Sequence, residues 1–176
     1  MNISWGPERV RKDGQSVAPD WTPTTDLIDG VTIREVRNVL KAGGAVTELI
    51  RADWFPEPLT IEQVFQVRLE PGALSAWHSH ERATDRLFAV RGIVKLVLCD
   101  LREGSASHGA VNEFFVGALR PRLIVVPPKV WHGVQNVSQG TAVVINMPDR
   151  AYCYEDPDHW RLSPDTDAIP YRFERP

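Results

Sequence analysis

The sequence predicts an all-β fold, a sandwich or barrel built from short strands. From Val31 onward, apolar and polar residues alternate in short runs, which is the pattern of half-buried strands. Glycine and proline interrupt these runs, as at Arg91-Gly92 and Pro127-Pro128, and short strands separated by such turns are typical of all-β domains. No long segment has the helical period. The strands expected in the second half are Arg86–Val90, Ile93–Cys99, Arg122–Val126 and Thr141–Met147.

The two ends of the chain differ from this middle part. Residues 1–30 form a polar, proline-rich arm that we expect to become ordered only against something else, such as a partner subunit, and residues 31–176 form the predicted domain. Ile61–Leu69 is the clearest strand, whereas Val31–Lys41 fits a short helix or a strand. We expect the tail from Asp149 to pack across the barrel, because its aromatic rings must be buried: Tyr152, Tyr154, Trp160, Tyr171 and Phe173.

The composition is that of one ordinary globular domain. The chain has 176 residues, of which 43% are hydrophobic and 24% charged, and its formal net charge is -3. Because no run of Lys or Arg occurs, nothing indicates binding to nucleic acid or to a membrane. The N-terminus lacks the apolar stretch of a signal peptide, so we expect a cytoplasmic protein. Cys99 and Cys153 fit reduced thiols, although a single buried disulfide is also compatible with the sequence.

Histidines mark the candidate site. The chain has 5 histidines, and two of them form the segment His78-Ser-His80. Residues i and i+2 of a strand point to the same face, so both imidazoles can reach one point. Asp85 follows after a short loop, and His132 lies in a second segment further along. Imidazole nitrogen and carboxylate oxygen suit Zn, Fe, Mn or Ni, although polar residues that merely line a barrel would also fit.

The spacing of these segments resembles the two motifs of cupins. The segment Gly72–Gly92 matches the first motif throughout, with Asp85 where Glu is more common. The segment Pro127–Asn136 resembles the second motif but has Lys129 where a Gly is usual. The resemblance implies a double-stranded β-helix, the cupin or jelly-roll barrel, in which the two motifs pair as strands. It also implies a metal site with three His and one carboxylate: His78, His80, Asp85 and His132.

Within the cupins, the chain is similar to the dTDP-4-dehydrorhamnose 3,5-epimerase family from about Leu40 to Phe173. The segment Arg91–Ser105 resembles that family's Arg-Gly-x-Val-x-Asp-Val-x-Val-Asp-x-Arg-x-x-Ser. The resemblance implies proton abstraction beside the ketone of a nucleotide-linked sugar, which needs a base on one face, a donor on the other and positive charge near the enolate. Further similar segments follow in the family's order: Lys41–Glu48, Val64–Val67, Gly72–His80 and Val126–Gly133.

The family resemblance assigns the base. Its catalytic His stands at the place of His78, and an Asp from the C-terminal region orients it. Asp165 and Asp167 are the candidates here, although both also fit a solvated turn. The chain departs from the family in having Ser75 where an Arg precedes the base and His80 where a Gln follows it. Because the family works without metal, these departures shift the pattern toward a metal cupin.

The proton donor is a second departure. The family's acid is a Tyr on the strand after the second His, and this chain has Asn146 or Ile145 at that place. Tyr152 and Tyr154 are the candidates to replace it, although each also fits a core or interface ring. His132 is expected to polarise the ketone or to hold a metal.

Several other residues are candidates for contact with the substrate. Arginine suits a diphosphate because it donates bidentately, although most single arginines are solvated at the surface. We expect Trp77 to pack outside the site, His108 to lie in a loop and His159 to take part in packing of the tail. The candidate substrate-binding residues are Arg51, Gln66, Arg86, Trp131 and Asn146.

Three functions fit these observations. The first is an isomerase of the sugar-epimerase type that acts on a nucleotide-linked 4-ketosugar, with or without a divalent metal. The second is a metal-dependent cupin of other chemistry, such as an oxygenase, a small-acid isomerase or a decarboxylase. The third is a sugar-binding cupin without catalytic activity. The family resemblance further implies a homodimer, and no cofactor if the chain follows the epimerases.

Overall fold

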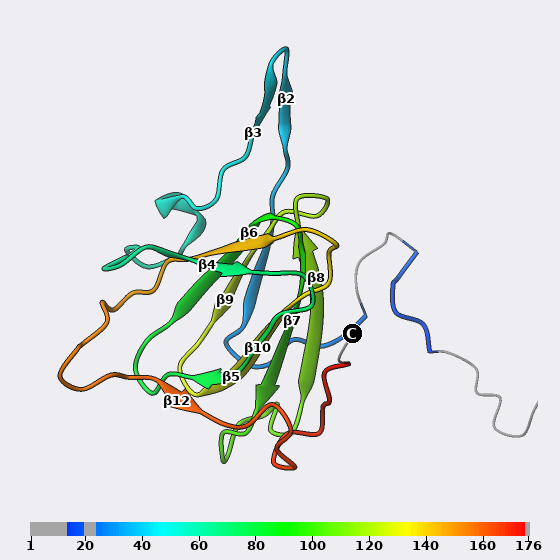
Figure 1. Cartoon of the computed structure of the whole chain (residues 1–176). Coiled ribbons are helices and arrows are strands. Elements are labelled where there is room, and N and C mark those ends of the chain that lie inside the picture. Colours follow the sequence, from blue (N-terminus) through cyan, green and yellow to red (C-terminus); the bar gives the residue numbers. More distant parts are fainter. Residues whose placement is uncertain (1–13, 20–23, 175–176) are drawn as a thin grey trace, which may run out of the picture.

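The computed structural model describes residues 14–19 and 24–174 (Figure 1). Its two main layers are antiparallel five-stranded sheets with the strand orders β1-β9-β6-β11-β4 and β12-β5-β10-β7-β8. In the described part no α-helix occurs, and a 3-10 turn spans Ala52–Trp54. No helix in these ranges is long and apolar enough to cross a membrane. The predicted all-β architecture is therefore confirmed.

The strands have the following bounds. The first sheet contains β1 (Thr32–Glu35), β4 (Phe65–Leu69), β6 (Asp85–Arg91), β9 (Arg122–Val126) and β11 (Ala142–Asn146). The second sheet contains β5 (Leu74–Ser79), β7 (Ile93–Asp100), β8 (Val111–Gly117), β10 (Val130–Asn136) and β12 (Trp160–Arg161). A separate hairpin consists of β2 (Val39–Lys41) and β3 (Gly44–Val46).

Strand β7 shows how the apolar pattern produces the layers. Alternate side chains such as Leu96 belong to the main core, whereas Val97 and Cys99 belong to a second cluster that includes Ile169 and Phe173 of the tail. Because both faces of β7 are covered, its sequence is nearly continuously apolar. Each fully buried side chain of this kind contributes roughly 1.5–3 kcal/mol of transfer free energy.

The tail confirms one part of its prediction and corrects another. Tyr171 and Phe173 pack on the buried Trp77, with ring centroids 6.2 and 5.1 Å away from the indole. Trp77 therefore lies outside the candidate site, as predicted. The expectation that all the aromatic rings of the tail are buried is wrong: Tyr152, Tyr154 and Trp160 are 47%, 82% and 58% exposed.

Two strand predictions change in detail. The strand expected at Ile61–Leu69 begins only at Phe65, because the preceding residues form an irregular segment in which the Glu62 N–H donates to the Pro148 carbonyl oxygen. Val31–Lys41 contains no helix; it contributes β1 to the first sheet and β2 to the hairpin.

Part of the predicted arm lies against the domain. Ile28 is 1% exposed and belongs to the main core, and its N–H donates to Asn112 Oδ1 at 2.9 Å. Residues 1–13 and 20–23 of the predicted arm lie outside the described residues. The partner-dependent ordering of the arm thus stays a prediction.

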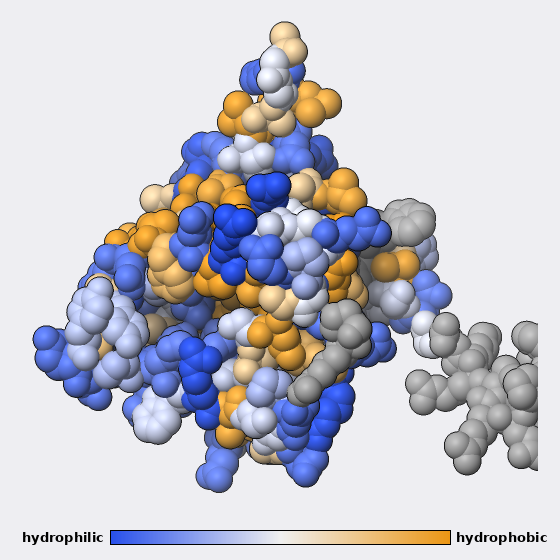
Figure 2. Space-filling view, viewed as in Figure 1, coloured by the Kyte–Doolittle hydropathy of each residue, from blue (hydrophilic) through white to orange (hydrophobic). Residues whose placement is uncertain are grey.

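The β2-β3 hairpin projects from the body (Figures 1 and 2). Its apolar residues Val39, Leu40 and Val46 are 52%, 81% and 54% exposed. An isolated two-stranded hairpin has little stability of its own in water, and apolar side chains on it gain stability by being covered.

The pairing of β5 with β10 places the candidate site. His132 lies directly opposite His78 across this pair, as the two-motif resemblance implied. The absence of a side chain at Gly133 allows β5 and the tail to pack closely against β10. A Cβ at this position would lie 2.6 Å from Ala76 Cβ and 2.9 Å from Phe173 Cζ. Before β10, Lys129 has a φ of 64°, a left-handed conformation that favours glycine, which explains the Gly of the usual motif.

Candidate active site

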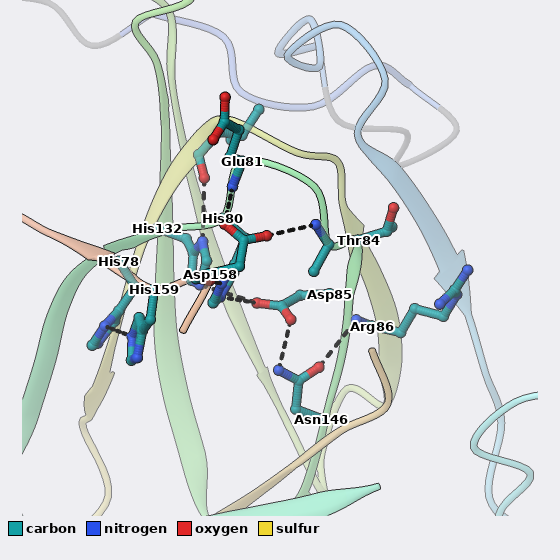
Figure 3. A network of polar contacts seen from close by, with 12 residues as sticks. His78, His80, Glu81, Thr84, Asp85, Arg86, His132, Asn146, Asp158 and His159 are labelled. Atoms are coloured by element: carbon teal, nitrogen blue, oxygen red, sulfur yellow. Dashed lines mark hydrogen bonds and ion pairs between the residues drawn. The ribbon is translucent and has the colours of Figure 1, made fainter. Parts of the chain in front are cut away.

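Four predicted residues come together from both sheets; in Figure 3, His80 and His132 lie beside Asp85, whereas His78 lies beside His159. His78 lies on β5, His80 directly follows it, His132 lies on β10, and Asp85 begins β6 of the other sheet. All four line a cavity of about 640 Å³, a volume typical of small-molecule sites. Residues far apart in the sequence thus form one pocket.

Asp85 is the centre of a hydrogen-bonded cluster. Its Oδ2 lies 3.3 Å from His80 Nε2 and 3.2 Å from His132 Nε2, and its Oδ1 accepts from Asn146 Nδ2 at 2.9 Å. Burial alone would raise the pKa of Asp85, but the hydrogen bonds from His132 and His80 hold it well below its usual range. The carboxylate is therefore ionised and fully partnered.

The other ring nitrogens of these histidines also face acceptors. His80 Nδ1 contacts the carbonyl oxygen of Asp158, and His132 Nδ1 lies 3.2 Å from the carbonyl oxygen of Val130. Burial opposes protonation of His80, but its hydrogen bond with Asp85 and the charge of that carboxylate raise its pKa. Since only an imidazolium donates from both nitrogens, the contacts of His80 favour positive charge on its ring.

The same cluster contains the atoms that could hold a metal. One ligand atom from each of His80, Asp85 and His132 lies within 4.8 Å of the others. In a tetrahedral zinc site with bonds of about 2.1 Å, ligand atoms lie about 3.4 Å apart, close to the 3.3 and 3.2 Å from Asp85 Oδ2 to the Nε2 atoms of His80 and His132. These three residues fit a divalent transition metal by donor type and by spacing.

His78 has a different environment. Its Nε2 lies 2.9 Å from Ser75 Oγ, and its Nδ1 lies 2.9 Å from His159 Nε2. Burial first, then the positive charges that His132 and Arg161 can carry, lowers the pKa of His78 to about 3. His78 is therefore a neutral imidazole on the cavity wall. The cupin resemblance implied that His78 is a fourth metal ligand, and this expectation is corrected: both of its nitrogens face Ser75 and His159, and it lies outside the cluster of His80, Asp85 and His132.

The tail supplies a part of the site that the sequence analysis missed. His159, which was assigned to packing of the tail, lines the cavity, with its ring 5.1 Å from that of His78 and 5.3 Å from that of His80. The Asp158 carboxylate accepts from the N–H groups of Glu81, Arg82 and Ala83 at 2.7, 2.8 and 3.1 Å. No ligand spacing links His159 to the motifs, so only the folded tail could reveal it.

The aspartates expected to orient His78 lie elsewhere. Asp165 is exposed and does not line the cavity, and the carboxylate of Asp167 pairs with Arg172. The position expected for Asp165 beside the base is taken by His159. The expectation that Asp165 or Asp167 orients His78 is therefore wrong. The tail reaches β5 at residues 159–161, before these aspartates, so His159 lies beside His78 instead.

Four of the candidate substrate contacts do not reach the cavity. Arg51 pairs with Glu48 and Asp53 on the surface. Arg86 follows Asp85 on the strand, so it points to the other face of the sheet (Figure 3). Its guanidinium lies 5.5 Å from the ring centroid of Phe55. Gln66 and Trp131 also lie outside the lining. For Gln66, Arg86 and Trp131 the correction follows from strand alternation, whereas Arg51 lies in no strand and directly precedes the 3-10 turn.

The other candidates do line the cavity. Asn146 binds Asp85 and also accepts from the Arg86 N–H at 3.2 Å. Tyr152 and Tyr154 belong to a loop at the cavity edge, with their ring centroids 5.2 Å apart. Sequence reasoning did not single out three arginines that line the cavity, Arg82, Arg150 and Arg161.

The comparisons with known proteins agree with this geometry. Residues 25–171 match the family model described as dTDP-4-dehydrorhamnose 3,5-epimerase. The chain is 31% identical over 136 residues to a probable low-salt glycan biosynthesis epimerase, Agl13, of Haloferax volcanii, covering 77% of this chain and 87% of that protein. It is 29% identical over 149 residues to the spore coat polysaccharide biosynthesis protein SpsL of Bacillus subtilis, covering 84% and 97%.

A solved structure gives the same result for the fold. The dTDP sugar isomerase from Desulfovibrio desulfuricans G20 matches with a TM-score of 0.76 and 26% identity, covering 82% of this chain and 90% of that chain. The predicted cupin barrel and the resemblance stated from sequence are both confirmed.

Proposed function

The chain belongs to the dTDP-4-dehydrorhamnose 3,5-epimerase family, and we propose that it epimerises the sugar of a nucleotide-linked 4-ketosugar. It is thus an isomerase-type enzyme. The observation that supports this reaction most directly is the position of His78: it stands where the family has its base, lines the cavity and contacts Ser75 and His159 rather than a carboxylate.

The reaction follows from this position. His78 takes the proton from the carbon next to the ketone, and the electron pair of that C–H bond moves into the enolate. A proton delivered to the opposite face of the same carbon restores the ketone with inverted configuration. Positive charge on His80, which its hydrogen bond with Asp85 favours, stabilises the enolate oxygen.

The proton donor is proposed to come from the loop at the cavity edge. Asn146 holds Asp85 through its amide, and an amide cannot serve as an acid. Tyr152 and Tyr154 line the cavity and have the hydroxyl that the reaction needs. Replacing each of them by Phe tests which hydroxyl delivers the proton.

The substrate class is supported by the cavity. Its volume of about 640 Å³ accommodates a small molecule, and arginine is the side chain best suited to phosphate oxygens. Arg82, Arg150 and Arg161 on the lining are the candidate partners of the diphosphate.

Deuterium wash-in tests the proposal. Wild-type protein incubated in D₂O with dTDP-4-keto-6-deoxyglucose should incorporate deuterium at C3 or C5, as mass spectrometry would show, and His78→Asn should not. Binding of dTDP to both proteins, measured by calorimetry, is the control. Tight binding by the wild type without exchange on several 4-ketosugars would identify a silent sugar-binding cupin and overturn the proposed reaction.

A metal-dependent cupin is the second candidate, and the Asp85 cluster favours it. His80, Asp85 and His132 would hold a Zn, Fe, Mn or Ni ion, which when bound would act as a Lewis acid on a substrate oxygen. Elemental analysis of protein purified without added metal tests this role. A stoichiometric metal in the wild type that is lost in His80→Ala supports it, and a metal-free wild type that shows no thermal shift with any of these ions overturns it.

We further propose a cytoplasmic homodimer. The projecting hairpin exposes Leu40 and its apolar neighbours, which a second copy would cover. Cys99 and Cys153 are free thiols, as predicted, and free thiols suit a reducing compartment. Sedimentation equilibrium of wild type and Leu40→Asp tests the dimer.

A further inference from the structure

The tail segment that carries His159 is fixed on both sides. Before it, the Asp158 carboxylate binds the three N–H groups of residues 81–83. After it, β12 pairs with β5, and Trp77 and Leu162 exchange backbone hydrogen bonds of 3.1 and 3.2 Å. The segment that carries the His159 imidazole is therefore fixed by contacts of its neighbours that do not involve the His159 ring.

Hydrogen-bond chemistry limits what the His78–His159 contact can be. The two nitrogens lie 2.9 Å apart, so one of them carries the proton and the other accepts. Ser75 Oγ can donate to Nε2 of His78, and Ser75 lines the cavity beside that nitrogen. If His78 is to accept a proton at Nε2, its own proton must sit on Nδ1.

We propose that His159 is a positioning residue that accepts a hydrogen bond from His78 Nδ1–H and so holds the base in its active tautomer. The inference rests on the proposed function and adds a role for a residue outside both sequence motifs. A second imidazole here takes the place of the carboxylate that the resemblance led us to expect. Like an Asp, it fixes the ring plane and leaves Nε2 without a proton, as the acceptor that Ser75 Oγ faces at 2.9 Å.

Kinetics of three variants test this role. His159→Leu should lower kcat for wash-in on the order of 100-fold and leave KM within a few-fold, because the substrate contacts remain. His159→Asp should retain most of kcat, because a carboxylate also accepts from Nδ1–H. His108→Leu is the matched control, since His108 is exposed and lies outside the cavity lining, and it should behave as wild type.

Chemical rescue tests whether His159 positions His78 or only stabilises the fold of the tail. Added imidazole should restore part of the activity of His159→Ala, which a purely structural loss would not allow. Equal kcat for His159→Leu and wild type, or a rise in KM with kcat unchanged, would overturn the inference while the proposed epimerase stands.

The tautomer itself can be measured without turnover. In ¹⁵N-histidine-labelled protein, the signal assigned to His78 by its absence from His78→Asn should show the Nδ1–H form in the wild type and a mixture in His159→Leu. An Nε2–H form in the wild type would contradict the proposal. Absence of wash-in by wild type would instead overturn the proposed function, so the two failures are distinguishable.

Discussion

Two buried aspartates, Asp85 and Asp100, differ in how their charge is held. Asp100 is 0% exposed and accepts from Arg102, Ser105 and Ser107, all within seven residues of it. Asp85 is 3% exposed and accepts from two histidines and an asparagine on other segments. Both carboxyls have a lowered pKa, yet only Asp85 lines the cavity.

The difference lies in the donors. Arg102 remains protonated at any ordinary pH, and it also donates to the Asp29 carbonyl oxygen at 2.7 Å. The Asp100 cluster therefore ties a turn to the segment before β1. Histidine donors can change their protonation or bind a metal, so the Asp85 cluster is suited to chemistry. A lowered pKa by itself does not distinguish a structural site from a functional one.

The largest expected effect is on activity. Asp85→Asn should lower wash-in on the order of 100-fold or more, because the amide removes the charge that orients His80 and His132. Asp100→Asn should keep near wild-type activity per folded molecule. Both are measured at equal folded concentration, set by circular dichroism. Similar losses in the two variants would remove the functional distinction between the clusters.

The next effect is on stability. Hydrogen bonds from Arg102 lower the pKa of Asp100, burial opposes this shift, and the serine hydroxyls add to the lowering. Because the folded pKa lies below the unfolded value, the stabilisation is present above about pH 4 and is lost as the pH falls through the folded pKa. Asp100→Asn should cost about 1–3 kcal/mol at pH 7.

This stability difference should shrink in acid. Urea unfolding of wild type and Asp100→Asn between pH 7 and pH 3 measures it. A gap between the two proteins that stays constant over this range would show that the charge of Asp100 is not its source.

The smallest expected effect comes from backbone strain, which differs between the Asp100 cluster and the Asp85 cluster. Near Asp100, the residues in the left-handed backbone conformation are Gly104 and Gly109, with φ of 76° and 82°. Near His80, the residue in this conformation is Lys129, with φ of 64°. Lys129→Gly should stabilise the protein by at most about 1 kcal/mol, offset by added freedom of the unfolded chain. Gly109→Ala should destabilise it. Thermal unfolding compares the two, and a destabilised Lys129→Gly would contradict the strain argument.

The two clusters also differ in how far sequence could predict them. The Asp100 cluster lies within one contiguous segment, and its Asp-x-Arg-x-x-Ser spacing was part of the family resemblance. Two spaced motifs predicted that His80, Asp85 and His132 lie together, but they also predicted His78 as a fourth ligand, and His78 lies outside that cluster. In both cases a short-range pattern carried the information.

The remaining parts of the site depend on long-range geometry. His159 enters because the tail crosses β5, a pairing that no local pattern specifies. Arg86 was predicted to face the substrate, but strand alternation places it on the face of β6 opposite to Asp85. The sequence does not say which of the two faces lines the cavity, and the folded structure shows that it is the face of Asp85. The positions of Tyr152 and Tyr154 depend on a loop without regular structure.

Asn146 has a consequence for the ageing of the protein. Its amide joins β11 to β6 by donating to Asp85 and accepting from the Arg86 N–H. Asparagine is a thermolabile residue, and deamidation would leave a carboxyl group of the same shape 2.9 Å from Asp85. Two buried carboxyls at that distance cannot both ionise, so loss of this one amide would force one of them to hold a proton and would weaken the charge that His80 and His132 face.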